Sequence, residues 1–372
     1  MIPYGKQNIS EDDIKAVIET LKSDFITQGP AIPQFEDALK NYVGAKHAVA
    51  VNSATSGLHI ACLALGVGKG DVVWTSPNSF VASSNAALYC GAGVDFVDID
   101  PNTYNISPDA LEEKLKQGRV PKVLIPVHFA GQSAEMVRIK KLADVYGFKI
   151  IEDAAHAIGG EYKGKKIGAC EFSDICVFSF HPVKIITTAE GGMAITNDAE
   201  LAKKMQLLRS HGITREIEGE KWEYEQQDLG FNYRMTDLQA ALGTSQLKRI
   251  DKFIARRREI VRRYDAALAE LPLQIPFQHP DTKSSYHLYP IVLDESEQRA
   301  EVFNKLRDTG IGVNVHYIPI HTQPYYKALG FKKGQFPAAE EYYSATISLP
   351  VFYDLKDDEQ EFVVTTLKNI LG

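Results

Sequence analysis

Asp153 and Lys184 are the two residues whose types and surroundings combine into useful chemistry. Asp153 stands near the end of the apolar run FKIIEDA (148–154), and ligands of open α/β sheets lie beyond the carboxyl ends of the strands. Lys184 lies between apolar residues in SFHPVKIITTAEGG, which lowers the pKa of a lysine and makes its amine nucleophilic enough to form an imine. Pyridoxal 5'-phosphate (PLP) chemistry requires such an amine and a carboxylate that keeps the pyridine nitrogen protonated. Taken alone, Asp153 is better explained as a helix N-cap and Lys184 as a surface residue.

Three further segments hold residues that suit the same cofactor. The segment NSATSG (52–57) joins a strand-like run to a helical one. Two explanations of this junction are open: its backbone N–H groups bind a phosphate, or its Ser or Thr side chain caps the helix. His156 is either a contact for a phenolic oxygen or a core histidine, and Phe80 either stacks on a flat ring or fills the core. The segment GVGKG (66–70) precedes a strand-like run and predicts a turn rather than a phosphate loop.

Composition and charge narrow the class of protein. The chain has 372 residues, 44% hydrophobic and 24% charged, with a net charge of −7 and a pI near 5.8, which argues against nucleic acid as a partner. The N-terminus lacks an apolar signal core, and no apolar run approaches the roughly 20 residues of a membrane span. We therefore expect a cytoplasmic protein without a metal site. Small or apolar neighbours predict buried free thiols for the four cysteines, Cys62, Cys90, Cys170 and Cys176.

The chemistry-bearing residues lie in an alternation of strand-like and helical runs. Strands alternating with helices predict a mostly parallel sheet wrapped by helices. The predicted strands are 47–52, 71–76, 93–99, 121–129, 148–154, 174–180 and 191–197, with helices over 55–65, 80–89 and 134–146.

The pattern changes after about residue 230 and predicts a second unit. Leucines at helical spacing predict one long helix over 236–270. Beyond it, YHLYPIVL (286–293) and GVNVHYIP (312–319) are predicted strands, and 296–309 and 357–370 are predicted helices. We therefore expect a large domain over 1–245, including an N-terminal arm, and a smaller C-terminal α/β domain over 246–372.

Motifs along nearly the whole chain resemble the DegT/DnrJ/EryC1/StrS family of PLP-dependent sugar aminotransferases. They are FITQGP (25–30), VNSATSGLH, EDAAHAIG, SFHPVKIITTAEGG, RSHGIT, LGFNYRMTDLQAALG and VHYIPIHTQPYY. The resemblance implies the aspartate aminotransferase-like fold, fold type I of PLP enzymes. Family members often carry Gln in place of His156, and Asn-x-x-Lys in place of the segment from His181 to Lys184.

The same resemblance implies a set of cofactor contacts. Lys184 would hold PLP as a Schiff base and shuttle a proton, and Asp153 would pair with the pyridine nitrogen. His156 would contact the phenolic oxygen, and Phe80 would cover the ring. The implied phosphate ligands are Ala54, Thr55 and Ser179, with Asn232 reaching the site of the neighbouring subunit in an obligatory homodimer.

The likeness also implies substrates. His-x-x-Lys followed by ITTAEGG, together with VHFAGQS, RSHGIT and GVNVHYIPIH, is similar to the branch that aminates C4 of UDP-linked keto sugars in pseudaminic acid synthesis. The implied reaction takes the amino group of L-glutamate to UDP-2-acetamido-2,6-dideoxy-β-L-arabino-hexos-4-ulose. The implied sugar-nucleotide contacts are Tyr4, Asp24, Phe25, Ile26, Thr27, His181, Asn314, Val315, His316 and Tyr317.

Other functions compete with this interpretation. An aminotransferase for UDP-4-keto-arabinose or for the D-configured 4-keto sugar would share nearly all of these motifs. A sugar 3-dehydratase of the same fold typically carries His at the lysine position, so Lys184 argues against it. A sugar-nucleotide-binding regulator without catalysis is disfavoured because a pure binder has no need of a desolvated lysine.

Overall fold

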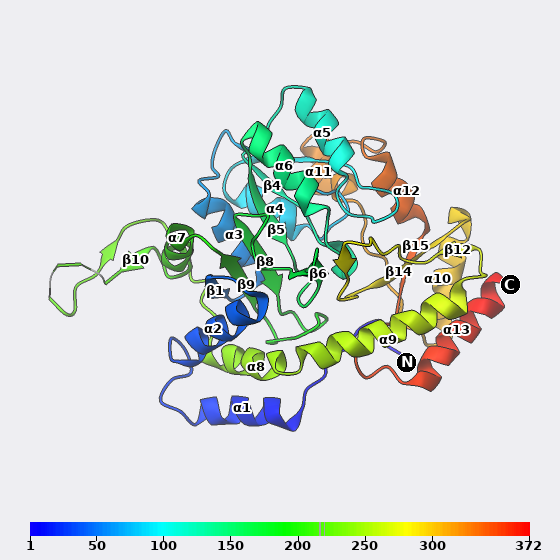
Figure 1. Ribbon diagram of the computed structural model, residues 1–372, viewed down its shortest axis with the longest axis horizontal. Helices are drawn as coiled ribbons and strands as arrows, with labels where there is room; N and C mark the ends of the chain where they lie inside the picture. Colours follow the sequence, from blue (N-terminus) through cyan, green and yellow to red (C-terminus); the bar gives the residue numbers. More distant parts are fainter. Residues whose placement is uncertain (216, 219) are drawn as a thin grey trace.

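The computed structural model describes residues 1–215, 217–218 and 220–372, which contain a central seven-stranded sheet of order β1-β9-β8-β5-β4-β2-β3 (Figure 1). The strands are β1 (His47–Val51), β2 (Val72–Thr75), β3 (Gly93–Phe96), β4 (Val123–Ile125), β5 (Lys149–Asp153), β8 (Ile175–Ser179) and β9 (Gly192–Thr196). Pairing is parallel from β3 to β8, and β9 runs antiparallel to both β1 and β8. The predicted α/β class with a mostly parallel sheet is confirmed.

Hydrophobic side chains on both faces hold the helices against this sheet. Val177 and Ala194 belong to the core under α3 (Ala54–Ala64), α4 (Ala82–Tyr89) and α7 (Ala199–Arg209). Cys176 and Phe178 belong to the opposite core, which includes residues of α2 (Ala31–Val43) and α8 (Asp237–Leu247). Because successive strand side chains point to opposite faces, a strand covered on both faces must be apolar throughout. The core under α5 (Pro108–Lys116) and α6 (Met136–Tyr146) covers the rest of the second face.

The predicted long helix is divided into two. A capping box of Thr236 and Gln239 starts α8, and α9 (Ile250–Leu268) follows after Lys248 and Arg249. The backbone of Arg249 leaves helical values there, and its guanidinium bonds Asn8 and the buried carboxylate of Asp13, which tie the N-terminal segment to the junction. The predicted domain boundary at 245/246 falls inside α8, and the division into two domains stays a prediction.

A smaller sheet follows α9. Its strands are β12 (Leu273–Gln274), β14 (Tyr289–Leu293) and β15 (Thr346–Leu349), in that order and antiparallel. A separate hydrophobic core joins this sheet to α9, α10 (Arg299–Asp308) and α13 (Asp357–Leu371). The predicted strand GVNVHYIP is wrong. Within 312–319 only Asn314 makes a bridge, to Ser348, because the segment crosses towards the large sheet, where the Tyr317 N–H bonds Asn78.

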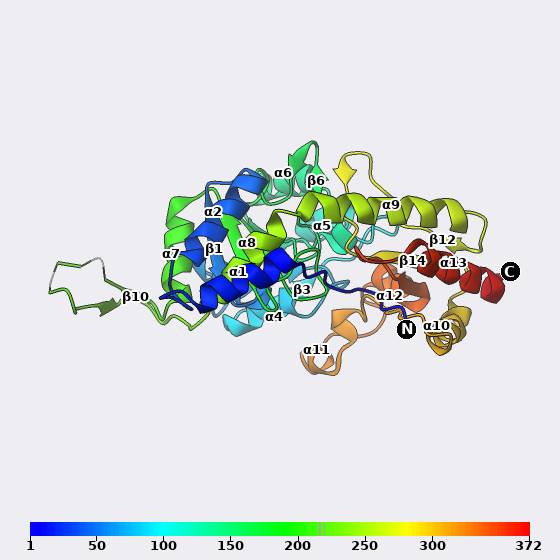
Figure 2. The same cartoon turned by 90° about the horizontal axis from the view of Figure 1, so that it is seen from below.

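Shorter elements complete the chain. They are α1 (Glu11–Leu21), α11 (Pro324–Ala328), α12 (Pro337–Ala345), and the three-stranded sheet of β6 (Glu161–Tyr162), β7 (Lys165–Lys166) and β13 (Thr282–Lys283). The hairpin of β10 (Ile213–Thr214) and β11 (Glu225–Gln226) projects from the body in both Figure 1 and Figure 2. Among the described residues, no helix has both the length and the apolar character needed to cross a membrane.

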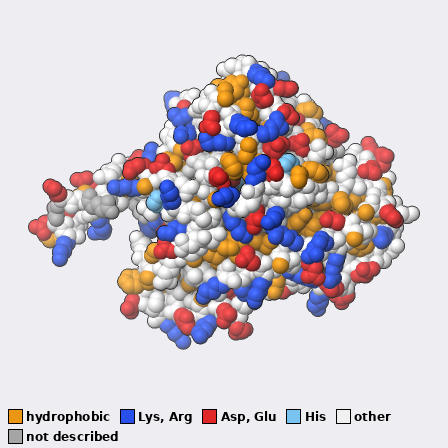
Figure 3. Space-filling view, viewed as in Figure 1, with side chains coloured by type: hydrophobic (Ala, Val, Ile, Leu, Met, Phe, Trp, Pro, Cys, Tyr) orange, Lys and Arg blue, Asp and Glu red, His pale blue; other side chains and the backbone are white. Residues whose placement is uncertain are grey.

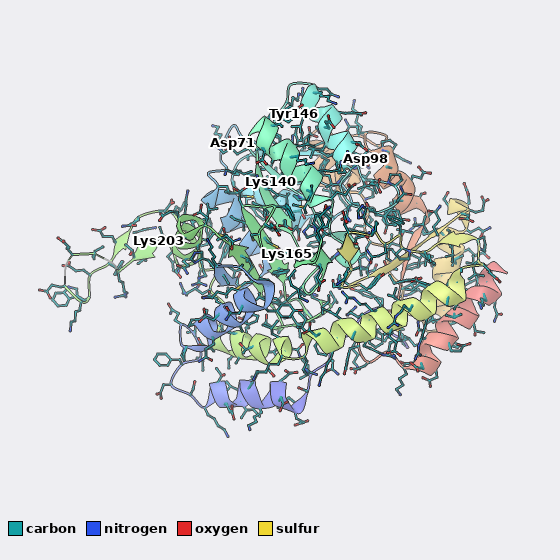
Figure 4. The ribbon with its side chains drawn as sticks, viewed as in Figure 1. Asp71, Asp98, Lys140, Tyr146, Lys165 and Lys203 are labelled. Carbon is teal, nitrogen blue, oxygen red and sulfur yellow. The ribbon has the colours of Figure 1, made fainter. Side chains whose placement is uncertain are left out.

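Hydrogen bonds fix the C-terminal part against the large sheet. Asp98, which follows β3, accepts the backbone N–H groups of Ala338 and Ala339 at 3.0 Å each, and Figure 4 places it beside α12. A carboxylate at a helix N-terminus satisfies otherwise unpaired N–H groups and complements the helix dipole. Charges of both signs are interspersed over the face shown in Figure 3.

Gly192 provides a test of how tightly the sheet supports the loop before α3. A Cβ at Gly192 would lie 2.6 Å from Ala54 N and from Ser53 C. We expect Gly192→Ala to lower the free energy of unfolding by about 1–3 kcal/mol through overpacking, measured as a lower urea midpoint at unchanged slope. Gly93→Ala is the control, because its Cβ would make an ordinary 3.5 Å contact with Val72. Equal midpoints for the two variants would contradict this account.

Candidate active site

The strand ends and the C-terminal segment enclose one cavity of about 560 Å³. It gathers most of the residues that the sequence singled out. They are Tyr4, Ala54, Thr55, Phe80, Asp153, His156, Ser179, His181, Lys184, Asn314, Val315, His316 and Tyr317. The cavity lies beyond the carboxyl ends of the strands because Asp153 and Ser179 are the last residues of β5 and β8.

Asp153 is a buried carboxylate that two donors hold in place. Ser83 Oγ donates to one oxygen at 2.6 Å, and the Ala155 N–H donates to the other at 3.1 Å. The residues that follow form turns rather than a helix, so the alternative explanation of Asp153 as a helix N-cap is not supported. Burial and these hydrogen bonds point the carboxylate into the cavity as an acceptor for a proton-bearing group.

Lys184 extends into the cavity from the loop between β8 and β9. Its ammonium nitrogen makes no hydrogen bond or ion pair with any described residue, although the Asp153 carboxylate is close enough to interact electrostatically. Burial lowers the pKa of Lys184 to about 8, and the negative charge of Asp153 acts in the opposite direction. About a tenth of the amine is therefore free at pH 7 and about half at pH 8, far more than for an exposed lysine with a pKa of about 10.4.

Neutral imidazoles surround this lysine. Burial, then the Lys184 charge, lowers the pKa of His156 and His287 well below the ordinary value and that of His316 to about 3. The rings of His156 and His287 lie 4.4 Å apart, centroid to centroid. Burial also raises the pKa of Tyr317, so its hydroxyl stays protonated and can donate to His156 Nε2 at 3.0 Å.

When Tyr317 donates to Nε2, the other nitrogen of the neutral His156 ring carries the proton. His156 Nδ1 is buried and has no partner among the described residues. An unpaired buried donor is costly, so this atom is fitted to an acceptor on a bound molecule. The phenolic oxygen of PLP is such an acceptor.

The start of α3 supplies an anion site on the opposite wall. Ser53 caps the helix by accepting the Ser56 N–H at 3.1 Å, and the first N–H groups of a helix have no acceptor inside it. Ala54 and Thr55 carry those groups into the cavity wall, where a phosphate is favoured. Of the two interpretations of NSATSG, the helix cap by Ser53 is confirmed. Phosphate binding by its neighbours is compatible with that cap and stays a prediction. With Asp153, Lys184 and His156, this donor set fits PLP.

Two predicted groups lie outside this cavity. Asp24, Phe25, Ile26 and Thr27 are exposed in the segment between α1 and α2, where Thr27 bridges Thr236. Asn232 is exposed as well, with its backbone paired to Ser210 and its carbonyl 3.5 Å from Asn52 Nδ2. Within one chain, neither group joins the other site residues.

Sequence reasoning missed part of the lining. The additional residues are Ser53, Leu58, Ser79, Ala82, Val127, Ala155, Val183, Glu190 and His287. His287 is the one with obvious chemistry. It belongs to YHLYPIVL, which was taken only as a strand, and its polar side chain in that apolar run was the available signal. Ser83, which orients Asp153, gave no signal because it lies inside a small-residue helix.

The fold and this site define a class of protein: an α/β enzyme in which one cavity holds a lysine of lowered pKa, a buried carboxylate and the start of a helix. The chain belongs to the DegT/DnrJ/EryC1/StrS aminotransferase family, whose model matches residues 7–368.

Named relatives agree with this membership. The spore coat polysaccharide biosynthesis protein SpsC of Bacillus subtilis (strain 168) is 42% identical over 381 residues, covering 100% of this chain and 97% of that protein. The UDP-4-amino-4,6-dideoxy-N-acetyl-beta-L-altrosamine transaminase of Campylobacter jejuni (strain 81-176) is also 42% identical, over 375 residues, covering 100% of this chain and 98% of that protein.

Solved structures extend the likeness to the fold and the cofactor. Helicobacter pylori PseC, an aminotransferase of pseudaminic acid biosynthesis, superposes with a TM-score of 0.93 at 35% identity over 100% of this chain and 99% of that one. A Streptococcus pneumoniae protein solved in a PLP form gives 0.91 at 32% identity, with 100% of both chains covered. The fold is therefore that of PLP fold type I, and the protein is a PLP-dependent sugar aminotransferase.

The pKa of Lys184 can be measured directly. In protein freed of cofactor, acetylation of Lys184 should rise through pH 8, because the free amine is the reacting form. After unfolding, the midpoint should return to about 10.4, the ordinary value for lysine. Asp153→Asn removes the charge that favours the ammonium, so its midpoint should move to lower pH. Quantitative mass spectrometry with Lys69 as internal reference gives the curves, and an ordinary lysine midpoint in the folded protein would refute the desolvation argument.

Proposed function

We propose that this enzyme transfers an amino group from L-glutamate to C4 of a UDP-linked 4-keto-6-deoxy-N-acetylhexosamine, UDP-2-acetamido-2,6-dideoxy-β-L-arabino-hexos-4-ulose, in pseudaminic acid biosynthesis. The carrying observation is the shared cavity of Lys184, Asp153 and the 314–317 segment. The likeness to a transaminase and to a solved structure, both named for this pathway, supports the choice of sugar.

Lys184 and Asp153 are assigned the central roles. When bound, PLP supplies an electron sink that stabilises negative charge at the carbon losing a proton. Lys184, with its lowered pKa, would hold the cofactor covalently and then carry the proton between the donor and acceptor carbons. Asp153, oriented by Ser83, would keep the pyridine nitrogen protonated.

Other cavity residues are assigned to the remaining parts of the cofactor. Ala54, Thr55 and Ser179 would hold the phosphate with backbone and hydroxyl donors, and Phe80, which is 61% exposed towards the cavity side, would cover the ring. His156 would donate Nδ1–H to the phenolic oxygen, because this nitrogen has no described protein partner.

The sugar-nucleotide side of the cavity is polar without being charged. His316 is neutral and bonded to Ser348 Oγ at 2.9 Å, and Tyr4 packs against its ring at 5.5 Å. Together with His181, Asn314, Val315 and Tyr317, these groups would hydrogen-bond sugar hydroxyls and pack on the ring.

A second candidate substrate is favoured by one specific finding. The relative named for spore coat polysaccharide synthesis is as similar as the relative named for altrosamine transamination. Another UDP-4-keto sugar, of D configuration or derived from arabinose, is therefore the alternative acceptor. A regulator without catalysis fits poorly, since it gains nothing from a lysine whose pKa is lowered to about 8.

The substrate assignment is tested with purified enzyme, L-glutamate and a panel of UDP-4-keto sugars. The L-arabino-configured N-acetylhexosulose should be consumed at least about tenfold more efficiently, by kcat/KM, than the D-configured and arabinose-derived sugars. Lys184→Ala should abolish turnover, and Asp153→Asn should bind cofactor but slow single-turnover amination of the cofactor strongly. A higher kcat/KM for another sugar would overturn the proposed substrate in favour of that sugar. Turnover by Lys184→Ala would refute the role of the lysine.

We also propose a homodimer with shared active sites, in the cytoplasm, where the four free cysteines would stay reduced. Exposed apolar side chains support an interface. On and near the projecting hairpin these are Trp222, Tyr224 and Leu229, and between α1 and α2 they are Phe25 and Ile26. Both groups lie at the same end of the molecule, where Figure 3 shows hydrophobic side chains beside the α1–α2 segment. In such a dimer, Asp24 to Thr27 and Asn232 would reach the partner's cavity.

Mixing inactive variants tests the shared site. Asn232→Ala and Lys184→Ala subunits should each be strongly impaired, and their heterodimer would contain one intact site and one doubly defective site. Random exchange makes half of the dimers mixed, so about a quarter of wild-type activity should return. A control mixture of Lys184→Ala with Asp153→Asn should recover almost nothing, because both residues belong to one chain's cavity. No recovery after exchange is verified by native mass spectrometry would place Asn232 in the site of its own chain.

A further inference from the structure

Two cysteines meet where α3 and α4 pack together, outside the cavity. Cys62 is fully buried on α3, and Cys90, which ends α4, is only partly buried against the same core. This corrects the prediction that all four cysteines are buried. Cys90 Sγ lies 3.2 Å from the Ala86 carbonyl and 4.0 Å from that of His59, which stands one helical turn before Cys62. Cys90 Sγ therefore lies against the turn of α3 that carries Cys62, and each of the two thiols shifts the pKa of the other.

The surroundings make the two thiols unequal. The hydrogen bond from Cys62 lowers the pKa of Cys90, burial opposes this, and His59 lowers it further. The same pairing, together with burial, raises the pKa of Cys62. Cys90 therefore ionises first, and it is also the less buried of the two residues. The thiolate is the form of cysteine that reacts with peroxides, so Cys90 is the thiol expected to react.

The other two cysteines lack this arrangement. Cys170 and Cys176 are buried, and burial followed by the charge of Glu152 raises the pKa of each thiol. Their Sγ atoms would react slowly with any oxidant because they hold their protons and are shielded. The chain thus carries one partly exposed thiol, Cys90, with the Cys62 thiol beside it. The two buried thiols, Cys170 and Cys176, serve as internal controls.

We infer that Cys62 and Cys90 form a hydroperoxide-responsive pair that closes to a reversible disulfide between α3 and α4. The Cys90 thiolate attacks one oxygen of hydrogen peroxide, the O–O bond breaks, and uptake of a proton gives the sulfenic acid and one water. Cys62 sulfur then attacks the Cys90 sulfur and expels the second water. Two thiols and one peroxide become one disulfide and two waters, and an external dithiol reverses the reaction.

Burial of Cys62 gives the pair its selectivity. Cys62 has no solvent access of its own, so its natural reaction partner is the sulfur of Cys90. Closure would link the ends of two helices that both begin at the cavity, α3 after Ser53 and α4 just after Phe80. The modification site is therefore separate from the cavity but connected to two of its walls.

The tryptic map distinguishes this disulfide from others. Cleavage after Lys69 places Cys62 and Cys90 on different peptides, 47–69 and 70–114, whereas Cys170 and Cys176 share peptide 167–184. The PLP-loaded protein is treated with a few equivalents of hydrogen peroxide, blocked with N-ethylmaleimide and digested without reductant. We expect the two peptides to appear joined, to separate on adding dithiothreitol, and two of the four thiols to be lost.

Single variants separate the two chemical steps. In Cys62→Ser, dimedone should trap a sulfenic acid on Cys90, whereas Cys90→Ser should give neither a dimedone adduct nor a joined peptide. Cys176→Ser is the matched control and should cross-link like the wild type. Oxidation of Cys90 only to sulfinic acid, or equal loss of thiols from peptide 167–184 in folded protein, would overturn the proposal.

Discussion

Desolvation of the Lys184 ammonium is the constraint on which the rest of the site depends. A buried cation is expensive, and here one carboxylate, Asp153, offsets that cost while the groups that pack around it stay neutral. His156, His287 and His316 all have lowered pKa values in part because Lys184 is near. Burial and mutual repulsion therefore keep the imidazoles neutral and lower the pKa of the lysine, which makes its free amine more available in a polar cavity.

These lowered pKa values require a rigid cavity wall, and the residues that fix this wall come from distant parts of the chain. Buried Arg257 on α9 donates to the carbonyls of Tyr286, His287 and Val351, which fixes the segment before β14 that carries His287. Its own pKa falls to about 10 through burial. With Asp98 capping α12, this bonding holds the C-terminal wall against the strand ends, so the neutral environment of the lysine is built in advance rather than assembled on binding.

The groups proposed for the chemistry and the segment proposed to contact the sugar come from different parts of the cavity. The lysine, carboxylate and helix start come from the sheet and its loops, whose geometry the parallel fold dictates. The wall at 314–317 comes from a segment that is irregular apart from the bridge between Asn314 and Ser348.

The sequence alone determined the α/β class, the strand order along the chain and the pairing of Asp153 with Lys184, because these depend on local apolar patterns and on strand ends. It also placed Phe80, His156 and the 314–317 segment in one site, through family motifs. Tertiary structure alone decided that 312–319 is irregular, that the long helix divides at Arg249, and that His287 faces the lysine. Those outcomes depend on contacts between segments far apart in the chain, such as Asp13 with Arg249 and Tyr317 with Asn78. Local periodicity carries no information about such contacts, and for the same reason it could not show that Cys90 would lie beside Cys62.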